Sequence, residues 1–183
     1  MAIATQITTG KVRFSYLNVF TPRKNDDGPD KYGVTLLIPK TDTATLNKIK
    51  AAQEAAKAKW VESGKKLPPN LKSTLHDGDG TRPEGDDFGP ECAGHYVITV
   101  NSNNKPAVVY ADKTPITDPQ ELWSGCYGRA VLNFYVYDFK GKKGISAGIN
   151  GIMKVHDGEP LAGGVVTDAD WDDGWEDGDD LLG

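Results

Sequence analysis

The stretch CYGRAVLNFYVYDFKGKKGISAGINGIMKV, residues 126–155, decides the fold class of this chain. Residues 126–139 alternate between apolar and polar side chains, the pattern of a long strand with one buried face. KGKKG is a tight basic turn, and residues 144–155 continue as another strand. The stretch therefore predicts a long hairpin near the end of the chain, with one face of its first strand in the core. The predicted core residues are Ala130, Leu132, Phe134 and Val136.

Two further strands are expected near the start of the chain. Residues 11–20 and 31–40 read as strands, and TPRKNDDGPD between them is rich in turn-forming Pro, Asn, Asp and Gly. They predict a hairpin with a long loop. On the first strand, the alternation places three apolar or aromatic side chains on one face: Val12, Phe14 and Tyr16.

The middle of the chain contains the only strong helix signal. Residues 41–63 begin with Thr and Asp, are rich in alanine and carry an apolar row at helical spacing. Residues 64–93 are loop-like, and strands resume at residues 94–102 and 105–113. The apolar row of the helix comprises Leu46, Ile49, Ala52, Ala56 and Trp60.

This order of elements favours a mainly β fold. About six strands and one helix are compatible with a small barrel or a sandwich. Long early strands, a helix between strand groups and a closing hairpin fit a five-stranded barrel of the OB type best. We predict an OB-fold-like nucleic-acid-binding domain over residues 1–156, in which residues 41–93 form a helix and a loop-rich insertion. Residues 157–183 are predicted to be an acidic, flexible C-terminal tail.

Length and composition limit the class of protein. A chain of 183 residues suits one domain with a real core. Cys92 and Cys126 have no disulfide-framework spacing, which favours a reducing compartment. The sequence has neither a signal-peptide pattern nor an apolar run of membrane-spanning length. We therefore expect a cytoplasmic protein that does not enter a membrane.

Charge is distributed unevenly along the chain. The net charge is −5, but residues 157–183 contain ten acidic residues and no Lys or Arg. Residues 1–156 keep all 21 basic residues and 16 acidic ones, which makes this part +5 and the tail −10. A basic body with an acidic tail indicates a charged partner. The tail cannot fold alone, since it has too little apolar surface to offset chain entropy.

Catalytic and metal-binding patterns are weak. Cys92, His95 and His76 could belong to a zinc site, but the paired spacings of a structural site are missing. The carboxylates in residues 77–87 and 168–173 lack the EF-hand spacing. We predict no enzyme activity, no metal and no cofactor. A metal-dependent enzyme that uses His76, Cys92, His95 and the carboxylates of residues 77–87 stays an alternative.

Binding chemistry is better represented. The polar face of residues 126–139 carries Arg and Asn beside two tyrosines, a composition that suits stacking of bases from a single strand. Lysines in the following turn and basic residues near residues 13–31 could neutralise phosphates alongside. We predict that single-stranded nucleic acid contacts Arg13, Arg23, Lys24, Lys31, Lys105, Tyr110, Arg129, Asn133, Tyr135, Tyr137, Lys140, Lys142 and Lys143.

These segments together resemble a phage-encoded family of single-stranded DNA-binding proteins with an elaborated OB fold. The likeness is carried by RFSYLNVFTP, YGVTLLIPKTD, NNKPAVVYADKTPITD, the quoted hairpin with its continuation HDGEPLAG, and the acidic end. It implies sequence-independent, cooperative coating of single strands in phage DNA replication, recombination or repair, without catalysis. The cytoplasm of an infected bacterial host would be the location. The chain departs from related tails by ending in Leu-Leu-Gly instead of an aromatic residue or Pro-Phe.

The tail itself suggests a regulatory role. Its acidic residues and two tryptophans imitate a single strand, so it could mask the basic groove until DNA displaces it. It would then recruit replication proteins such as DNA polymerase, while copies of the protein associate along the DNA. Alternatively, the acidic end makes the chain a DNA mimic, an inhibitor or a structural phage protein. The tail residues concerned are Asp168, Asp170, Trp171, Asp172, Asp173, Trp175, Glu176, Asp177, Asp179, Asp180, Leu181 and Leu182.

Overall fold

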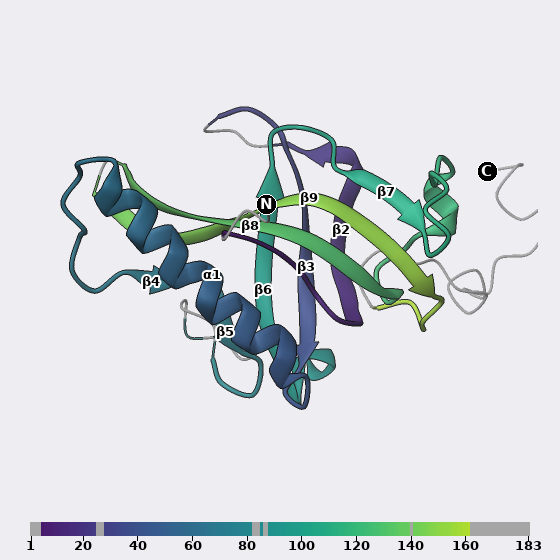
Figure 1. The fold of residues 1–183 in the computed structure, drawn as a ribbon. Coiled ribbons are helices and arrows are strands. Elements are labelled where there is room, and N and C mark those ends of the chain that lie inside the picture. Colours follow the sequence, from purple (N-terminus) through teal and green to yellow (C-terminus); the bar gives the residue numbers. More distant parts are fainter. Residues whose placement is uncertain (1–4, 25–27, 82–84, 86–87, 140, 162–183) are drawn as a thin grey trace, which may run out of the picture.

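The computed structural model describes residues 5–24, 28–81, 85, 88–139 and 141–161. Within these residues the fold is mainly β, with one long helix (Figure 1). The helix and strands are β1 (Gln6–Thr8), β2 (Val12–Arg23), β3 (Lys31–Pro39), α1 (Thr43–Glu62), β4 (Lys72–Ser73), β5 (Leu75–Asp77), β6 (His95–Ser102), β7 (Ala107–Tyr110), β8 (Tyr127–Phe139) and β9 (Lys142–His156). Two short 3₁₀ helices, Pro90–Cys92 and Pro119–Glu121, lie in the connections.

The closing hairpin forms as predicted. β8 and β9 pair antiparallel along nearly their whole length, from Tyr127 opposite His156 to Phe139 opposite Lys142. The alternate β8 residues Ala130, Leu132 and Phe134 are almost completely buried, as an alternating strand requires. This hairpin supplies one wall of the core and extends beyond the rest of the sheet.

Five strands close into a barrel in the order β2, β3, β6, β9, β8 and back to β2. All neighbours are antiparallel except β6 and β9, which run parallel where Asn101 faces Gly148. At the β2–β8 seam, a Cβ on Gly128 would lie 1.9 Å from the Met153 carbonyl oxygen and 2.7 Å from Cζ of Phe14. Only glycine allows the strands to approach so closely here. The predicted OB-like five-stranded barrel is confirmed.

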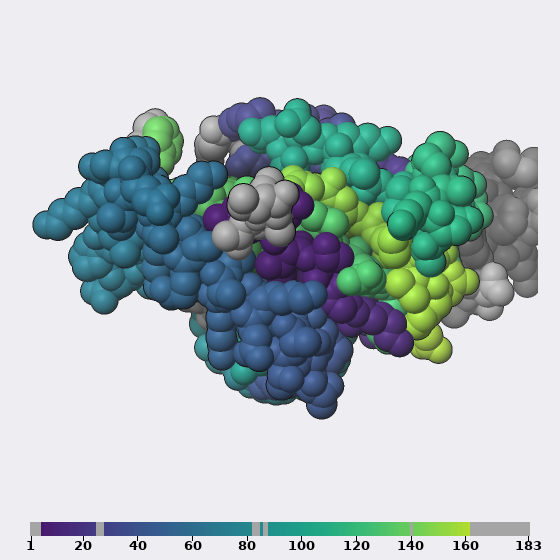
Figure 2. Space-filling view, in the orientation of Figure 1, coloured from purple at the N-terminus to yellow at the C-terminus, as the bar shows by residue number. Residues whose placement is uncertain are grey.

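The predicted helix at residues 41–63 is also confirmed as α1. Asp42 caps its first turn by accepting a hydrogen bond from the Thr45 backbone N–H at 3.1 Å. The apolar row then packs on the barrel core, with Ile49 and Ala52 almost completely buried. Figure 2 shows α1 and the loop after it covering one end of the molecule. No helix in the described part of the chain is long and apolar enough to cross a membrane.

The excursion at residues 64–93 contains more structure than predicted. β5 adds to β6, and β4 lies parallel to β9. The Lys40 ammonium binds Asp77 and Asp79, each at 2.7 Å, and so fixes the middle of this excursion beside the end of β3. The strand β1 was not predicted, because it is short and forms only by pairing with β8.

Candidate nucleic-acid interface

A shallow groove crosses the outward face of β2, β3 and β6. Its floor is formed by the hydroxyls of Thr35 and Thr99, 3.3 Å apart, and by the side chain of Asn101. Gly33 leaves room for this side chain, since a Cβ there would lie 2.6 Å from Asn101 Oδ1. The floor is therefore low and carries hydrogen-bonding groups, with Val34 as an apolar member of the lining.

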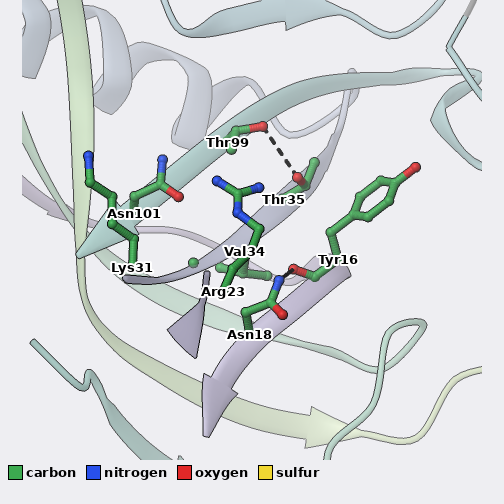
Figure 3. A pocket seen from close by; sticks show the side chains of 9 residues that line it. Tyr16, Asn18, Arg23, Lys31, Val34, Thr35, Thr99 and Asn101 are labelled. Carbon is green, nitrogen blue, oxygen red and sulfur yellow. Dashed lines mark hydrogen bonds between the residues drawn. The ribbon is translucent and has the colours of Figure 1, made fainter. Parts of the chain in front are cut away.

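Two basic side chains lie beside this floor. Arg23 and Lys31 are opposite one another where β2 ends and β3 begins. Figure 3 shows Lys31 and Asn101 on one side of the groove, Tyr16 on the other and Arg23 between them. Like charges directly opposite in a sheet repel one another, and a bound phosphate would relieve that repulsion. The structure thus brings two of the predicted contacts together on one groove.

Tyr16 was predicted on the same face as Val12 and Phe14, and this is wrong. The β2–β3 register shifts between Ser15 and Asn18, and Tyr16 has a φ of 48°, in the left-handed region. A bulge of this kind redirects the side chain, so Tyr16 is 61% exposed. The Asn18 amide holds the bulge by donating to the Tyr16 carbonyl oxygen at 3.1 Å. Strained bulges often lie at functional sites, and this one adds an aromatic ring to the groove.

The tyrosines of β8 continue the surface. Tyr135 and Tyr137 face outward, with 44% and 38% of their surface exposed. They lie beside glycines of β9: a Cβ on Gly148 would be 4.0 Å from Tyr135 Cε1, and one on Gly144 would be 3.0 Å from the Tyr137 hydroxyl. Gly148 in turn faces Asn101 across the β6–β9 pairing. The strand pairing therefore places the two tyrosines on the surface that continues from the groove floor.

The tip of the β8–β9 hairpin is basic and aromatic. Lys142 and Lys143 are exposed and face Phe139 and Asp138 on the opposite strand. Phe139, 69% exposed, was not predicted as a contact, although the outward alternation of β8 extends to it. Lys140 lies outside the described residues.

The groove and the two basic loops lie where OB folds usually bind oligonucleotides. In that fold, oligonucleotides bind across the second and third barrel strands and the loops after the first and fourth. Here those strands are β3 and β6, and those loops join β2 to β3 and β8 to β9. The sequence indicated both loops through their basic residues, but not the groove floor between them.

Two predicted arginines have internal partners instead. Arg13 donates from Nε to the Gly125 carbonyl oxygen at 3.1 Å and from Nη2 to that of Glu159 at 2.7 Å. Arg129 donates from Nε to the Thr9 carbonyl oxygen at 2.8 Å and lines a separate apolar hollow of about 180 Å³. Both side chains therefore fix backbone segments, and neither lines the groove.

The other predicted contacts are dispersed. Tyr110 is partly buried against the core, and Asn133 Oδ1 accepts a hydrogen bond from Thr5 at 3.0 Å. Lys105 follows β6 with its ammonium 5.7 Å from the Phe20 ring centre. Lys24 is exposed directly after Arg23.

The residues of the alternative metal site have other roles. Asp77 and Asp79 hold Lys40, whose ammonium donates hydrogen bonds that lower the pKa of both carboxyls. These same bonds raise the pKa of Lys40. Cys92 is buried, whereas His95 Nδ1 lies 2.8 Å from the Ala93 carbonyl oxygen. In the described ranges, no three His, Cys, Asp or Glu side chains gather as metal ligands would.

A family model described as the single-stranded DNA-binding protein of Enterobacter phage Enc34 matches residues 5–182. The chain belongs to this family. A curated relative, protein p50 of Acyrthosiphon pisum secondary endosymbiont phage 1, is 30% identical over 171 residues, covering 88% of this chain and 89% of p50.

Solved structures of similar proteins share this fold. The bacteriophage Enc34 single-stranded DNA-binding protein in complex with single-stranded DNA is 28% identical, with a TM-score of 0.74 over 87% of this chain and 90% of that one. The single-stranded DNA-binding protein gp2.5 of bacteriophage T7 is 18% identical, with a TM-score of 0.60 over 94% and 96% of the chains, and shares the fold. The predicted family resemblance is confirmed. The predicted tail contacts, from Asp168 to Leu182, lie outside the described residues.

Proposed function

We propose that this protein binds single-stranded DNA independently of base sequence and coats it during phage DNA replication, recombination or repair. The observation that carries the proposal is the groove of β2, β3 and β6, which is flanked by two basic loops and joined to exposed tyrosines. The Enc34 relative solved with single-stranded DNA supports the same ligand. Binding alone, without catalysis, would be the protein's activity, in the cytoplasm of an infected bacterial host.

The groove suits a flexible single strand. Tyr16, Tyr135 and Tyr137 offer flat rings on which bases can stack, a contact worth roughly 1–3 kcal/mol per base. Arg23 and Lys31 would neutralise phosphates between the stacked bases. Such contacts use features that every nucleotide has, so they favour binding without sequence preference.

The first test is a fluorescence titration with oligo-dT at low and high salt. Quenching that saturates and weakens with salt is expected, since phosphate contacts release counterions. Absence of quenching from the full chain and from a chain ending at Thr167 would reject single-strand binding and favour a DNA mimic.

The acidic tail would regulate this binding. Residues 157–183 carry −10 and are tethered to the +5 body, so the tail meets the groove at an effective concentration on the order of mM. It would compete with short or weak ligands, yield to long single strands, and then be available to replication proteins such as DNA polymerase. The chain ending at Thr167 should bind oligo-dT more tightly than the full chain at low salt. Equal or weaker binding would refute the masking role but not DNA binding.

A further inference from the structure

A second hollow with a different composition lies between the end of α1 and β8. It has a volume of about 220 Å³ and is lined by Ala56, Lys59, Trp60, Ser63 and residues 133–136. Its lining is partly apolar and partly polar. Cavities of roughly 150 Å³ accept an aromatic ring such as benzene, so this hollow can take the ring of a tryptophan.

The rim of this hollow is basic. Lys59, Lys65 and Lys66 are exposed, and the Lys65 ammonium lies 4.5 Å from the Trp60 ring centre. Trp60 is held by donating from Nε1 to the Lys66 carbonyl oxygen at 3.0 Å. In the part of the chain that the structure describes, no carboxylate comes within ion-pair distance of these three amines, although Glu62 is nearby in sequence. An aromatic floor with a cationic rim fits a ligand that combines aromatic rings with carboxylates.

The tail of this chain has that chemistry, but it leaves the body far from the hollow. Leu161, the last described residue, donates its backbone N–H to the Ser124 carbonyl oxygen at 3.0 Å. Ser124 precedes β8, whereas the hollow lies at residues 133–136, roughly 30 Å further at the usual rise of a strand. Figure 1 shows these opposite ends, with the end of β9 on the right and the end of α1 on the left.

This separation favours a tail that is supplied by another copy. Trp171 is ten residues beyond Leu161. A fully extended segment of that length spans at most about 35 Å, while its average span is only about 17 Å. Docking of Trp171 in its own chain would thus require nearly full extension, which costs conformational entropy. Trp175, 14 residues beyond Leu161, has an average span of about 21 Å, which is also shorter than the separation. A neighbouring copy whose tail end faces this hollow has no such constraint.

We infer that the hollow between α1 and β8 binds the acidic, tryptophan-containing tail segment, residues 168–177, of a second copy of this chain. One copy's tail end then meets the next copy's α1 end, a head-to-tail contact that repeats along a strand. The inference rests on the proposed function, because DNA bound in the groove would displace the tail and align the copies. The contact would make binding to long strands cooperative.

Carbodiimide cross-linking tests the contact directly. Full-length protein with natural nitrogen is mixed with ¹⁵N-labelled protein on long poly-dT, cross-linked and digested for mass spectrometry. The expected products join Lys59, Lys65 or Lys66 to tail carboxylates in pairs of mixed isotope. If every cross-linked pair carries a single isotope, the hollow binds the tail of its own chain. If the tail cross-links only to Lys24 or Lys31, the tail lies in the groove. Either result overturns the inference.

A binding measurement checks the consequence. The double variant Lys59→Ala, Lys65→Ala should lose about tenfold in affinity for long poly-dT and keep wild-type affinity for an oligonucleotide that holds one copy. Trp171→Ala with Trp175→Ala should give the same loss, and combining both pairs should add little, since they remove one contact. The matched control Lys50→Ala, Lys113→Ala removes equal charge elsewhere and should change nothing. An equal loss of affinity in the control variant would refute the contact. If the wild-type protein does not bind the short oligonucleotide, the proposed function is refuted instead.

Discussion

Removing the charges of Arg23 and Lys31 tests whether the groove holds phosphates. Each neutralised phosphate contributes about 0.7 to the slope of log K against log salt for a single strand. If Arg23, Lys24, Lys31, Lys142 and Lys143 each contact one phosphate, the wild-type slope is about −3.5, and the variant Arg23→Gln, Lys31→Gln should have a slope of about −2.1. Between 50 and 200 mM salt, wild-type affinity should then fall roughly 100-fold and the variant's roughly 20-fold.

The assay is a fluorescence titration with oligo-dT at four or more salt concentrations. Arg23 is exposed and Lys31 is half-buried at a strand end, so thermal unfolding should confirm that the variant is folded. The control variant Lys50→Gln, Lys113→Gln loses the same two charges outside the groove and should keep the wild-type slope. A wild-type slope in the groove variant, or an equal change in the control, would refute the phosphate track on β2 and β3.

Other substitutions separate binding from stability. Tyr16→Ala and Tyr135→Ala should each weaken oligo-dT binding by about 5- to 150-fold, the equivalent of roughly 1–3 kcal/mol per stacked base, while phenylalanine at either position should preserve it. Gly128→Ala should lower the free energy of unfolding in urea by more than about 3 kcal/mol, because its Cβ meets backbone at the barrel seam; a stable variant would contradict the closure argument. Gly148→Ala should stay within about 1 kcal/mol of wild type in the same experiment, since the nearest atom to its Cβ is 3.5 Å away. Arg13→Met should lower stability by about 1–3 kcal/mol and leave the salt slope of DNA binding unchanged; a smaller slope would make Arg13 a phosphate contact.

The elements with strong periodic patterns could be predicted from the sequence. In β8 the alternation identified the buried side chains Leu132 and Phe134, and in α1 the apolar row identified Ile49 and Ala52. These patterns depend on local geometry, which the sequence records directly. The bulge at Tyr16 leaves no such record, because its extra residue is defined by the register against β3. The alternation predicted for this strand therefore continues through Tyr16, where the bulge in the backbone breaks it.

The candidate groove could be predicted from the sequence where it consists of loops. Basic turns can be recognised without knowledge of the fold, and they led to Arg23, Lys31 and the hairpin tip. The floor residue Thr35 lies within a strand that is buried on both faces for most of its length, so only barrel closure shows which positions face outward. Arg13 was predicted as a DNA contact from its charge and its place on a strand. Neither feature reveals its acceptors, the carbonyl oxygens of Gly125 and Glu159, which are 112 and 146 residues away in the chain. Long-range partners of this kind decide whether a cation is available to a ligand.

The chemistry of the groove floor bears on whether base sequence can be read. Reading a base edge requires side chains with unsatisfied donors and acceptors in a fixed pattern. Thr35 and Thr99 share one hydrogen bond, which occupies one of their two hydroxyl donors, and Asn101 lies against the backbone over Gly33. Stacking and phosphate contacts should then dominate, and the affinities for oligo-dT, oligo-dC and oligo-dA should lie within about tenfold of one another. A larger preference that disappears in Asn101→Ala would show that the floor reads base edges. The same preference retained in that variant would assign it to stacking on the tyrosines.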